Sequence, residues 1–150
     1  MAWGYINKKE VFHSMNVLFF LTTKDSVTYV TETDNIGSVL DKMRESGFTA
    51  IPLLGKDGRY IGTITEGDLL WNLEDKDHLE RRELRKKSIQ TVKRRRDNQE
   101  VNVMAHIDDL IDKVVNQNFV PVVDDNGVFI GIVTRKEVLT HLVGEARKDK

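Results

Sequence analysis

The stretch GFTAIPLLGKDGRYIGTITEGDLL at residues 47–70 returns in a closely similar form as NFVPVVDDNGVFIGIVTRKEVL at residues 118–139. The two copies align without a gap, and their matched positions share one offset, 121 − 52 = 69 for the two prolines. The matched pairs are Pro52 with Pro121, Gly58 with Gly127, Gly62 with Gly131, Thr65 with Thr134 and Leu70 with Leu139. A long internal repeat determines architecture before any single residue does, so we expect two copies of one structural unit.

Each copy reads as helix, strand, turn, strand, helix. Apolar residues with helical spacing precede both stretches, starting at Ile36 and Ile107, an offset of 107 − 36 = 71. We expect strands at 50–54, 60–65, 119–123 and 128–134, with Gly58 and Gly127 in the hairpin turns. A further strand is predicted at residues 26–31. Asp34 or Asn35 should cap the first helix, and Gly47 should end it.

Composition excludes several classes of protein. The chain has 150 residues, a formal net charge of −1 and no cysteine, so a disulfide framework and a thiolate metal site are excluded and no global attraction to polyanions is expected. The apolar run at residues 17–21 is too short to span a membrane, and no signal-peptide cleavage pattern follows it. We therefore expect a cytoplasmic protein without a membrane partner.

The segments outside the repeat permit two interpretations each. A short helix is predicted at residues 7–15, and the aromatic residues around it could cover the first unit or form a dimer contact. These aromatic residues are Trp3, Tyr5, Phe12, Phe19 and Phe20. The basic stretch from Arg81 to Arg96 could be a solvated linker or a polyanion contact. We divide the chain into an N-terminal segment (1–25), unit 1 (26–74), a charged linker (75–98), unit 2 (99–143) and a polar tail (144–150).

The end of the second hairpin strand carries the most informative chemistry. Thr65 is followed three residues later by Asp68, and Thr134 is followed by Glu137 at the same spacing. A hydroxyl with free amides at a helix N-terminus suits a phosphate, and an acid one turn later suits ribose hydroxyls. The alternative is a capping box, in which the acid folds back on the threonine amide.

These motifs resemble the CBS domain family, as a tandem pair often called a Bateman module. The resemblance covers residues 26–142 and is carried by the two prolines, the paired glycines and the Thr-x-x-acid motifs. It implies an α/β (α+β) fold of two pseudo-symmetric β-α-β-β-α units packed sheet to sheet, with clefts between them. It also implies a regulatory adenosyl-ligand sensor that is not an enzyme, commonly binding AMP, ADP, ATP, S-adenosylmethionine or cyclic di-AMP.

The same resemblance implies the site residues. Phe48, Thr49, Ala50, Ile51 and Pro52 match the segment that lines adenine, with Thr28 beside it, and Thr65 and Asp68 match the nucleotide motif. In the second copy the matching residues are Phe119, Val120, Pro121, Thr134 and Glu137, the last of which replaces an aspartate. The first set is the preferred site.

A narrower similarity is to small stand-alone two-CBS proteins of Gram-positive bacteria, some of which bind cyclic di-AMP. In that group the two basic residues after the hairpin threonine, here Arg135 and Lys136, meet phosphate. A lysine that the group uses near the first strand is Ser26 here, with Lys24 two residues away.

The expected partners are an adenosyl small molecule, a second copy in a homodimer and a regulated protein. Two other functions remain open, a structural dimerisation module without ligand and nucleic-acid binding through Arg81 to Arg96. The histidines share no metal-ligand spacing, so we expect them to face solvent or cap helices. Trp71 is expected to pack between the units or in a dimer core.

Overall fold

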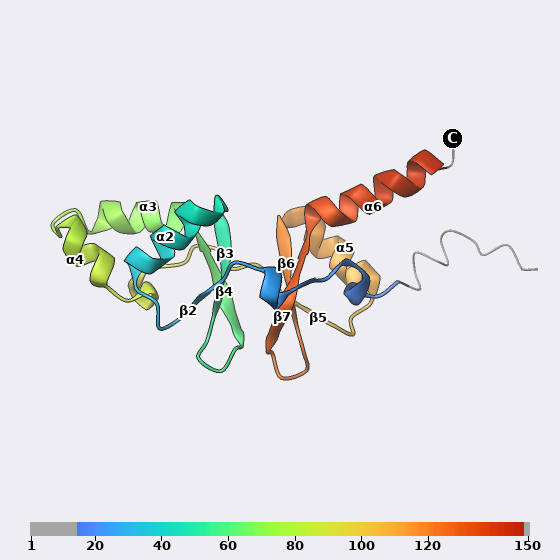
Figure 1. Cartoon of the computed structure of the whole chain (residues 1–150), viewed down its shortest axis with the longest axis horizontal. Helices are drawn as coiled ribbons and strands as arrows, with labels where there is room; N and C mark the ends of the chain where they lie inside the picture. Colours follow the sequence, from blue (N-terminus) through green and yellow to red (C-terminus); the bar gives the residue numbers. More distant parts are fainter. Residues whose placement is uncertain (1–14, 149–150) are drawn as a thin grey trace, which may run out of the picture.

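The computed structural model describes residues 15–148, and it consists of two similar units side by side (Figure 1). Unit 1 contains β2 (Val30–Thr31), α2 (Ile36–Ser46), β3 (Ala50–Leu54), β4 (Tyr60–Thr65) and α3 (Glu66–Asp75). Unit 2 contains β5 (Val101–Asn102), α5 (Ile107–Asn116), β6 (Phe119–Val123), β7 (Phe129–Thr134) and α6 (Arg135–Lys148). The predicted pair of β-α-β-β-α units is confirmed.

Each unit has a sheet of the same construction. In unit 1, β2 runs parallel to β3, and β3 pairs antiparallel with β4, with Pro52 opposite Thr63. In unit 2, β5 is parallel to β6, and β6 pairs antiparallel with β7, with Pro121 opposite Ile132. Both hairpins turn on a glycine in the left-handed region, Gly58 at φ 84° and Gly127 at φ 79°. The sequence repeat is therefore a repeat of structure down to the register of the strands.

The helix caps follow the local sequence. The Asn35 side chain accepts a hydrogen bond from the Ser38 amide (2.8 Å), and Gly47 ends α2 at φ 74°. In unit 2, the side chain of His106 accepts from the Asp108 amide (3.2 Å) and caps α5. That helix ends at Gln117 with φ −130°, because unit 2 has no glycine at this point. The capping role expected for a histidine is confirmed at His106.

The N-terminal segment packs on unit 2. It forms η1 (Val17–Phe20), β1 (Thr22–Thr23) and η2 (Lys24–Ser26), and β1 adds a strand to β7. Phe20 is 3% exposed within the unit 2 core, so the interpretation that these aromatic residues cover unit 1 is wrong for Phe20. Trp3, Tyr5 and Phe12 lie outside the described residues, as does the predicted helix at 7–15 except for Met15.

The charged segment between the units packs on unit 1. It forms α4 (Arg81–Lys86) and η3 (Ile89–Thr91), and its side chains Leu84, Ile89 and Val92 are buried in the unit 1 core. The interpretation of a solvated linker is therefore wrong for these apolar residues, although most of the charged side chains around them are exposed. Each apolar side chain buried in this way contributes about 1.5–3 kcal/mol, which explains why a charged segment folds here.

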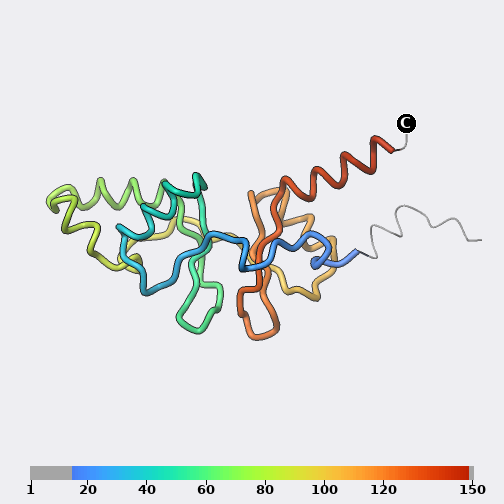
Figure 2. Tube along the Cα trace, viewed as in Figure 1, coloured from blue at the N-terminus to red at the C-terminus, as the bar shows by residue number. Residues whose placement is uncertain are grey.

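Backbone contacts join the two hairpins, which lie next to each other at the centre of the molecule (Figure 2). The Tyr60 amide donates to the Gly127 carbonyl (3.2 Å), and the Phe129 amide donates to the Gly58 carbonyl (3.0 Å). The Arg59 guanidinium donates to the carbonyl of Asn126 (2.8 Å). These reciprocal bonds relate the units by an approximate twofold axis, as the repeat predicts.

Several finer predictions are wrong. The strand expected at 26–31 is only Val30–Thr31: Ser26 belongs to a 3-10 turn, and only Val30 and Thr31 pair with β3. Trp71 is 44% exposed and is not packed between the units, so that part of its prediction is wrong, whereas packing in a dimer core stays a prediction. His141 neither faces solvent nor caps a helix, because its ring packs on those of Phe19 and Phe20 at centroid distances of 5.2 and 5.5 Å.

Candidate functional site

A glycine in each sheet lets another segment of the chain lie close against the strand. At Gly131 in β7, a Cβ atom would clash with the Thr22 carbonyl oxygen and would lie 2.8 Å from Leu21 Cδ1. At the equivalent Gly62 in β4, a Cβ atom would lie 2.5 Å from Arg94 Nε and would clash with the Asp97 carboxylate. Glycine is needed because only a residue without a side chain leaves room for the crossing segment. Residues 21–22 thus run alongside β7 at the edge of the unit 2 sheet, and residues 94–97 run alongside β4 of unit 1. We call them the crossing segments, because each leads from one unit to the other.

These crossing segments form one wall of each of two clefts between the units. Cleft I has a volume of about 390 Å³, and cleft II has a volume of about 640 Å³. Cleft I is lined by Thr22, Ser26, Val27, Thr28, the residues from Phe48 to Pro52, Asn118, Phe119, Ile132, Thr134 and Glu137. Cleft II is lined by Ala50, Thr65, the residues from Arg96 to Gln99, Asp112, Lys113 and the residues from Asn116 to Phe119.

Cleft I combines an apolar floor with hydroxyl groups and one carboxylate. Ile51 is buried in its floor (1% exposed), whereas the ring of Phe48 is 56% exposed at its edge. At the start of α6, the Thr134 hydroxyl accepts from the Glu137 amide (3.2 Å), and the Thr22 hydroxyl donates to Glu137 Oε1 (3.1 Å). Glu137 is therefore held at the cleft with its Oε2 atom still available to a ligand. Such a site suits a ligand in which a flat apolar ring is joined to a sugar with free hydroxyl groups.

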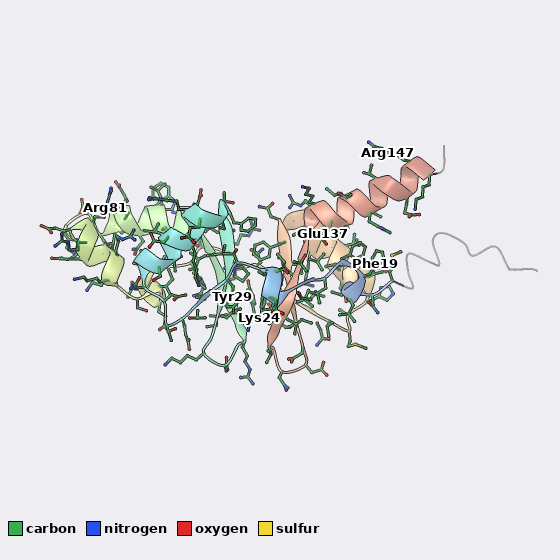
Figure 3. All side chains as sticks on the ribbon, in the orientation of Figure 1. Phe19, Lys24, Tyr29, Arg81, Glu137 and Arg147 are labelled. Atoms are coloured by element: carbon green, nitrogen blue, oxygen red, sulfur yellow. The ribbon has the colours of Figure 1, made fainter. Side chains whose placement is uncertain are left out.

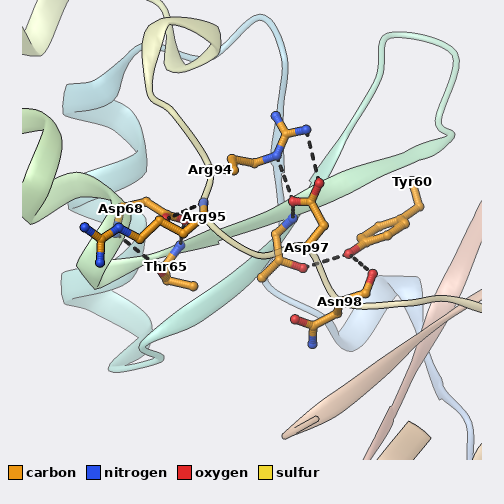
Figure 4. A network of polar contacts seen from close by, with 8 residues as sticks. Tyr60, Thr65, Asp68, Arg94, Arg95, Asp97 and Asn98 are labelled. Carbon is orange, nitrogen blue, oxygen red and sulfur yellow. Dashed lines mark hydrogen bonds and ion pairs between the residues drawn. The ribbon is translucent and has the colours of Figure 1, made fainter. Parts of the chain in front are cut away.

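The threonine and aspartate of unit 1 form a closed structure instead (Figure 4). The Thr65 amide donates to Asp68 Oδ2 (3.0 Å), and the Asp68 amide donates to the Thr65 hydroxyl (3.1 Å). The second carboxylate oxygen of Asp68 accepts from the Arg95 amide (3.0 Å). Asp68 is 2% exposed and lines neither cleft, so the capping-box alternative describes its role in this structure.

A polar network fixes the segment that crosses unit 1 (Figure 4). Asp97 accepts from the Thr63 amide (3.0 Å) and from Arg94 Nε (2.8 Å). The Tyr60 hydroxyl donates to the Asn98 carbonyl (2.7 Å), and burial raises the pKa of that hydroxyl far above its usual range. Since this segment supplies Arg96 to Gln99, the wall of cleft II is held rigidly.

Polar side chains also occupy cleft II from the unit 2 side. The Gln117 side chain accepts from the Gln99 amide (2.8 Å) and donates to the Gln99 carbonyl (3.0 Å). The Asn98 side chain donates to the Phe119 carbonyl (2.8 Å). Gln117, Asn118 and Phe119 therefore take the place that Phe48, Thr49 and Ala50 have in cleft I. The two clefts have the same architecture but different chemistry.

The predicted site residues fall into three groups. Cleft I brings together Thr28, Phe48, Thr49, Ala50, Ile51, Pro52, Phe119, Thr134 and Glu137. Thr65 lines cleft II, and Val120 and Pro121 are buried in the body of unit 2. Arg135 and Lys136 line neither cleft, and the Arg135 guanidinium donates to the Val114 carbonyl (2.8 Å). The segment predicted to line adenine, Phe48 to Pro52, therefore shares cleft I with the Thr134 motif of unit 2, and of its residues Ala50 alone also lines cleft II beside Thr65.

Sequence reasoning missed the residues that the crossing segment contributes. Thr22, Ser26 and Val27 line cleft I, together with Asn118 and Ile132 of unit 2. The available signal was Gly131, since its match with Gly62 marks a close approach of another chain segment in both units. Within residues 15–148, no group of three or more acidic or histidine side chains could hold a metal ion. None of the helices in that range is both long and apolar enough to cross a membrane.

Comparisons with known proteins agree with this architecture. The family model described as CBS domain matches residues 21–75 and 95–144. An uncharacterised protein of Methanopyrus kandleri, MK0525, is 31% identical over 111 residues, which cover 71% of this chain; the chain spans only 53% of that relative. The cyclic di-AMP receptor B of Bacillus subtilis is 34% identical over 131 residues, covering 82% of this chain and 83% of the receptor.

Among solved structures, the crystal structure of CbpB in complex with c-di-AMP has a TM-score of 0.82 and 26% sequence identity. The similarity covers 93% of this chain and 92% of the CbpB chain. Both the length and the tandem arrangement of units are therefore shared with that protein.

Proposed function

The chain belongs to the CBS domain family, and on that basis we propose that it is a cytoplasmic regulatory module that binds an adenine nucleotide in cleft I. Cyclic di-AMP is the first candidate ligand, ahead of AMP, ADP and ATP. The reason is that the cyclic di-AMP receptor B and the CbpB complex with c-di-AMP both match most of the chain. The proposal rests mainly on one observation: residues 48–50 of unit 1 and Thr134 and Glu137 of unit 2 line the same cleft. The role is binding and regulation, without catalysis.

The chemistry of cleft I supports a nucleoside. An adenine ring can lie on the apolar floor and stack on the exposed ring of Phe48. The free carboxylate oxygen of Glu137 can accept hydrogen bonds from ribose hydroxyls. The hydroxyl hydrogen of Thr134 and the exposed ammonium group of Lys136 lie at the start of α6, where phosphate is favoured. Arg135 can reach phosphate only by giving up its bond to the Val114 carbonyl.

A homodimer is the second part of the proposal. Leu70 and Leu73 of α3 are 57% and 41% exposed, and Leu139 and Leu142 at the matching positions of α6 are 50% and 36% exposed. Both helices lie along the same side of the molecule (Figure 1). A second copy that covers this pair of apolar faces would bury them, and nucleotide binding would favour one arrangement of the dimer by its differential affinity. A regulated protein could read that arrangement.

The two alternatives are weaker. The basic stretch proposed for nucleic acid is divided in the structure. Arg81 lies on α4 at the outer end of unit 1 (Figure 3), whereas Arg94 is paired with Asp97 and the Arg95 amide is bound by Asp68. A purely structural dimerisation module would leave cleft I without a ligand. Binding measurements separate both alternatives from the proposal.

The test is a thermal-shift panel with cyclic di-AMP, AMP, ADP, ATP and S-adenosylmethionine. A nucleotide at 100 times its Kd adds about 2.7 kcal/mol to the free energy of unfolding, which raises Tm by roughly 5–11 °C for a domain of this size. The shift should be lost in Glu137→Gln and kept in Glu66→Gln, which makes the same change of charge at the start of α3, the helix of unit 1 that corresponds to α6. A flat panel would overturn the proposal, and equal shifts in both variants would remove cleft I as the site.

A further inference from the structure

A third concave surface lies between α3 and the segment that crosses unit 1. It has a volume of about 510 Å³ and shares no lining residue with either cleft. We call it the basic hollow. Its charged lining residues are Lys76, Lys93, Arg94 and Arg95 on the basic side and Asp68 and Asp75 on the acidic side. Because the whole chain carries a net charge of −1, this basic excess is a local feature.

Three of its cations have no acidic partner. Arg94 is paired with Asp97 at 2.8 Å, but Lys76, Lys93 and Arg95 make no ion pair with any residue from 15 to 148. The buried carboxylate of Asp68 accepts one hydrogen bond on each oxygen from a backbone amide and makes no ion pair with any residue from 15 to 148. Asp75 is therefore the one acidic side chain of the lining that is exposed and unpaired, against three free cations.

Contacts with neighbouring residues hold the side chains of Arg94 and Arg95 in place. The Arg95 amide is bound by Asp68, and its guanidinium lies 4.7 Å from the centre of the Trp71 ring. Arg94, the residue directly after Lys93, is held by Asp97, which is itself bound to the Thr63 amide. Side chains that are already ordered lose less entropy when a partner binds. Trp71 is 44% exposed, so the hollow also offers an apolar surface beside its charges.

We propose that the basic hollow binds an acidic segment of a protein partner, at a site separate from cleft I. Exposed tryptophan and arginine side chains are the groups most enriched in protein interfaces. The free cations lie along an extended stretch and a neighbouring helix end, which suits carboxylates spaced along a peptide. A nucleic acid would require a longer basic track, but on α4 Arg85 is already paired with Asp41 at 2.9 Å.

The test is the binding of a fluorescently labelled glutamate-rich peptide, measured by anisotropy at low ionic strength, with a glutamine-rich peptide of the same length as control. Lys93→Gln with Arg95→Gln should weaken binding about tenfold, because two exposed charge contacts are lost. The matched pair Arg82→Gln with Lys86→Gln on α4 makes the same change of charge and should leave the affinity within about twofold of the parent. All four side chains are exposed, so both variants should fold.

A second readout locates the peptide. In a Trp3→Phe background, Trp71 is the one remaining tryptophan of the chain, and its emission should change as the peptide binds. Three results would overturn the proposal: no binding of the acidic peptide, equal loss in both double variants, or tighter binding of a single-stranded oligonucleotide of the same charge. The outcome is independent of cyclic di-AMP, because the hollow shares no residue with cleft I.

Discussion

Replacing Gly131 with alanine should test the close approach of the N-terminal segment to β7. The new Cβ atom would clash with the Thr22 carbonyl oxygen and would lie 3.1 Å from the Thr22 carbonyl carbon. Because the obstacle is backbone, no rotation of a side chain can relieve it, and residues 21–23 must move off the strand. Overpacking of this kind costs about 1–3 kcal/mol, which lowers Tm by roughly 2–12 °C for a chain of this size. Cleft I would lose the wall that Thr22 forms, so nucleotide affinity should fall as well.

Gly144→Ala is the matched control. Gly144 lies within α6, and a Cβ atom there would meet nothing within 4 Å. Alanine is the better helix former, so this variant should gain up to about 1 kcal/mol. Chemical denaturation with urea measures both variants on one scale. A Gly131→Ala protein as stable as the parent would refute the close crossing.

Three further predictions concern stability. Phe20→Ala should cost about 3–5 kcal/mol because Phe20 is buried in unit 2, whereas Phe19→Ala, at a position 60% exposed, should cost less than about 1 kcal/mol; equal losses in urea titrations would contradict the packing described. Asp68→Ala should cost about 2–4 kcal/mol by leaving two part-buried amides without an acceptor, and a near-neutral result would show that the capping box does not form. The pKa of the Tyr60 hydroxyl is raised in the folded chain, so the stability that its protonated form contributes is fully present below the usual pKa of 10.0 and is lost as pH rises above it. Tyr60→Phe should therefore flatten the fall of the free energy of unfolding at high pH, and an unchanged slope would argue against a buried hydroxyl.

The sequence predicts the units well because their signals are local. Helix caps, hairpin glycines and alternating apolar residues each depend on a few neighbouring positions, and most of these signals occur in both copies of the repeat. Gly47 illustrates this, since its left-handed conformation ends α2 as its position in the pattern predicts.

The arrangement of the clefts could not be read in the same way. A repeat shows that two units are alike, but not which part of one faces which part of the other. The approximate twofold axis places Phe48 and Thr134 in the same cleft. An interpretation that considers unit 1 alone wrongly pairs Phe48 with Thr65, which lines the other cleft. The two-residue strand β1 has no periodicity to detect, because its pairing with β7 is a tertiary contact. Leu84 was likewise hidden among charged neighbours, although it is 6% exposed.

Calorimetric titration of cyclic di-AMP into the parent chain and into Phe48→Ala tests the nucleotide site most directly. Phe48 is 56% exposed, so its truncation should change the free energy of unfolding by less than about 1 kcal/mol. Stacking of a base on an aromatic ring contributes about 1–3 kcal/mol, so Kd should rise about 5- to 150-fold. The account predicts saturable binding to the parent and this weakening in the variant. The absence of binding to the parent, or an unchanged Kd in Phe48→Ala, would contradict it.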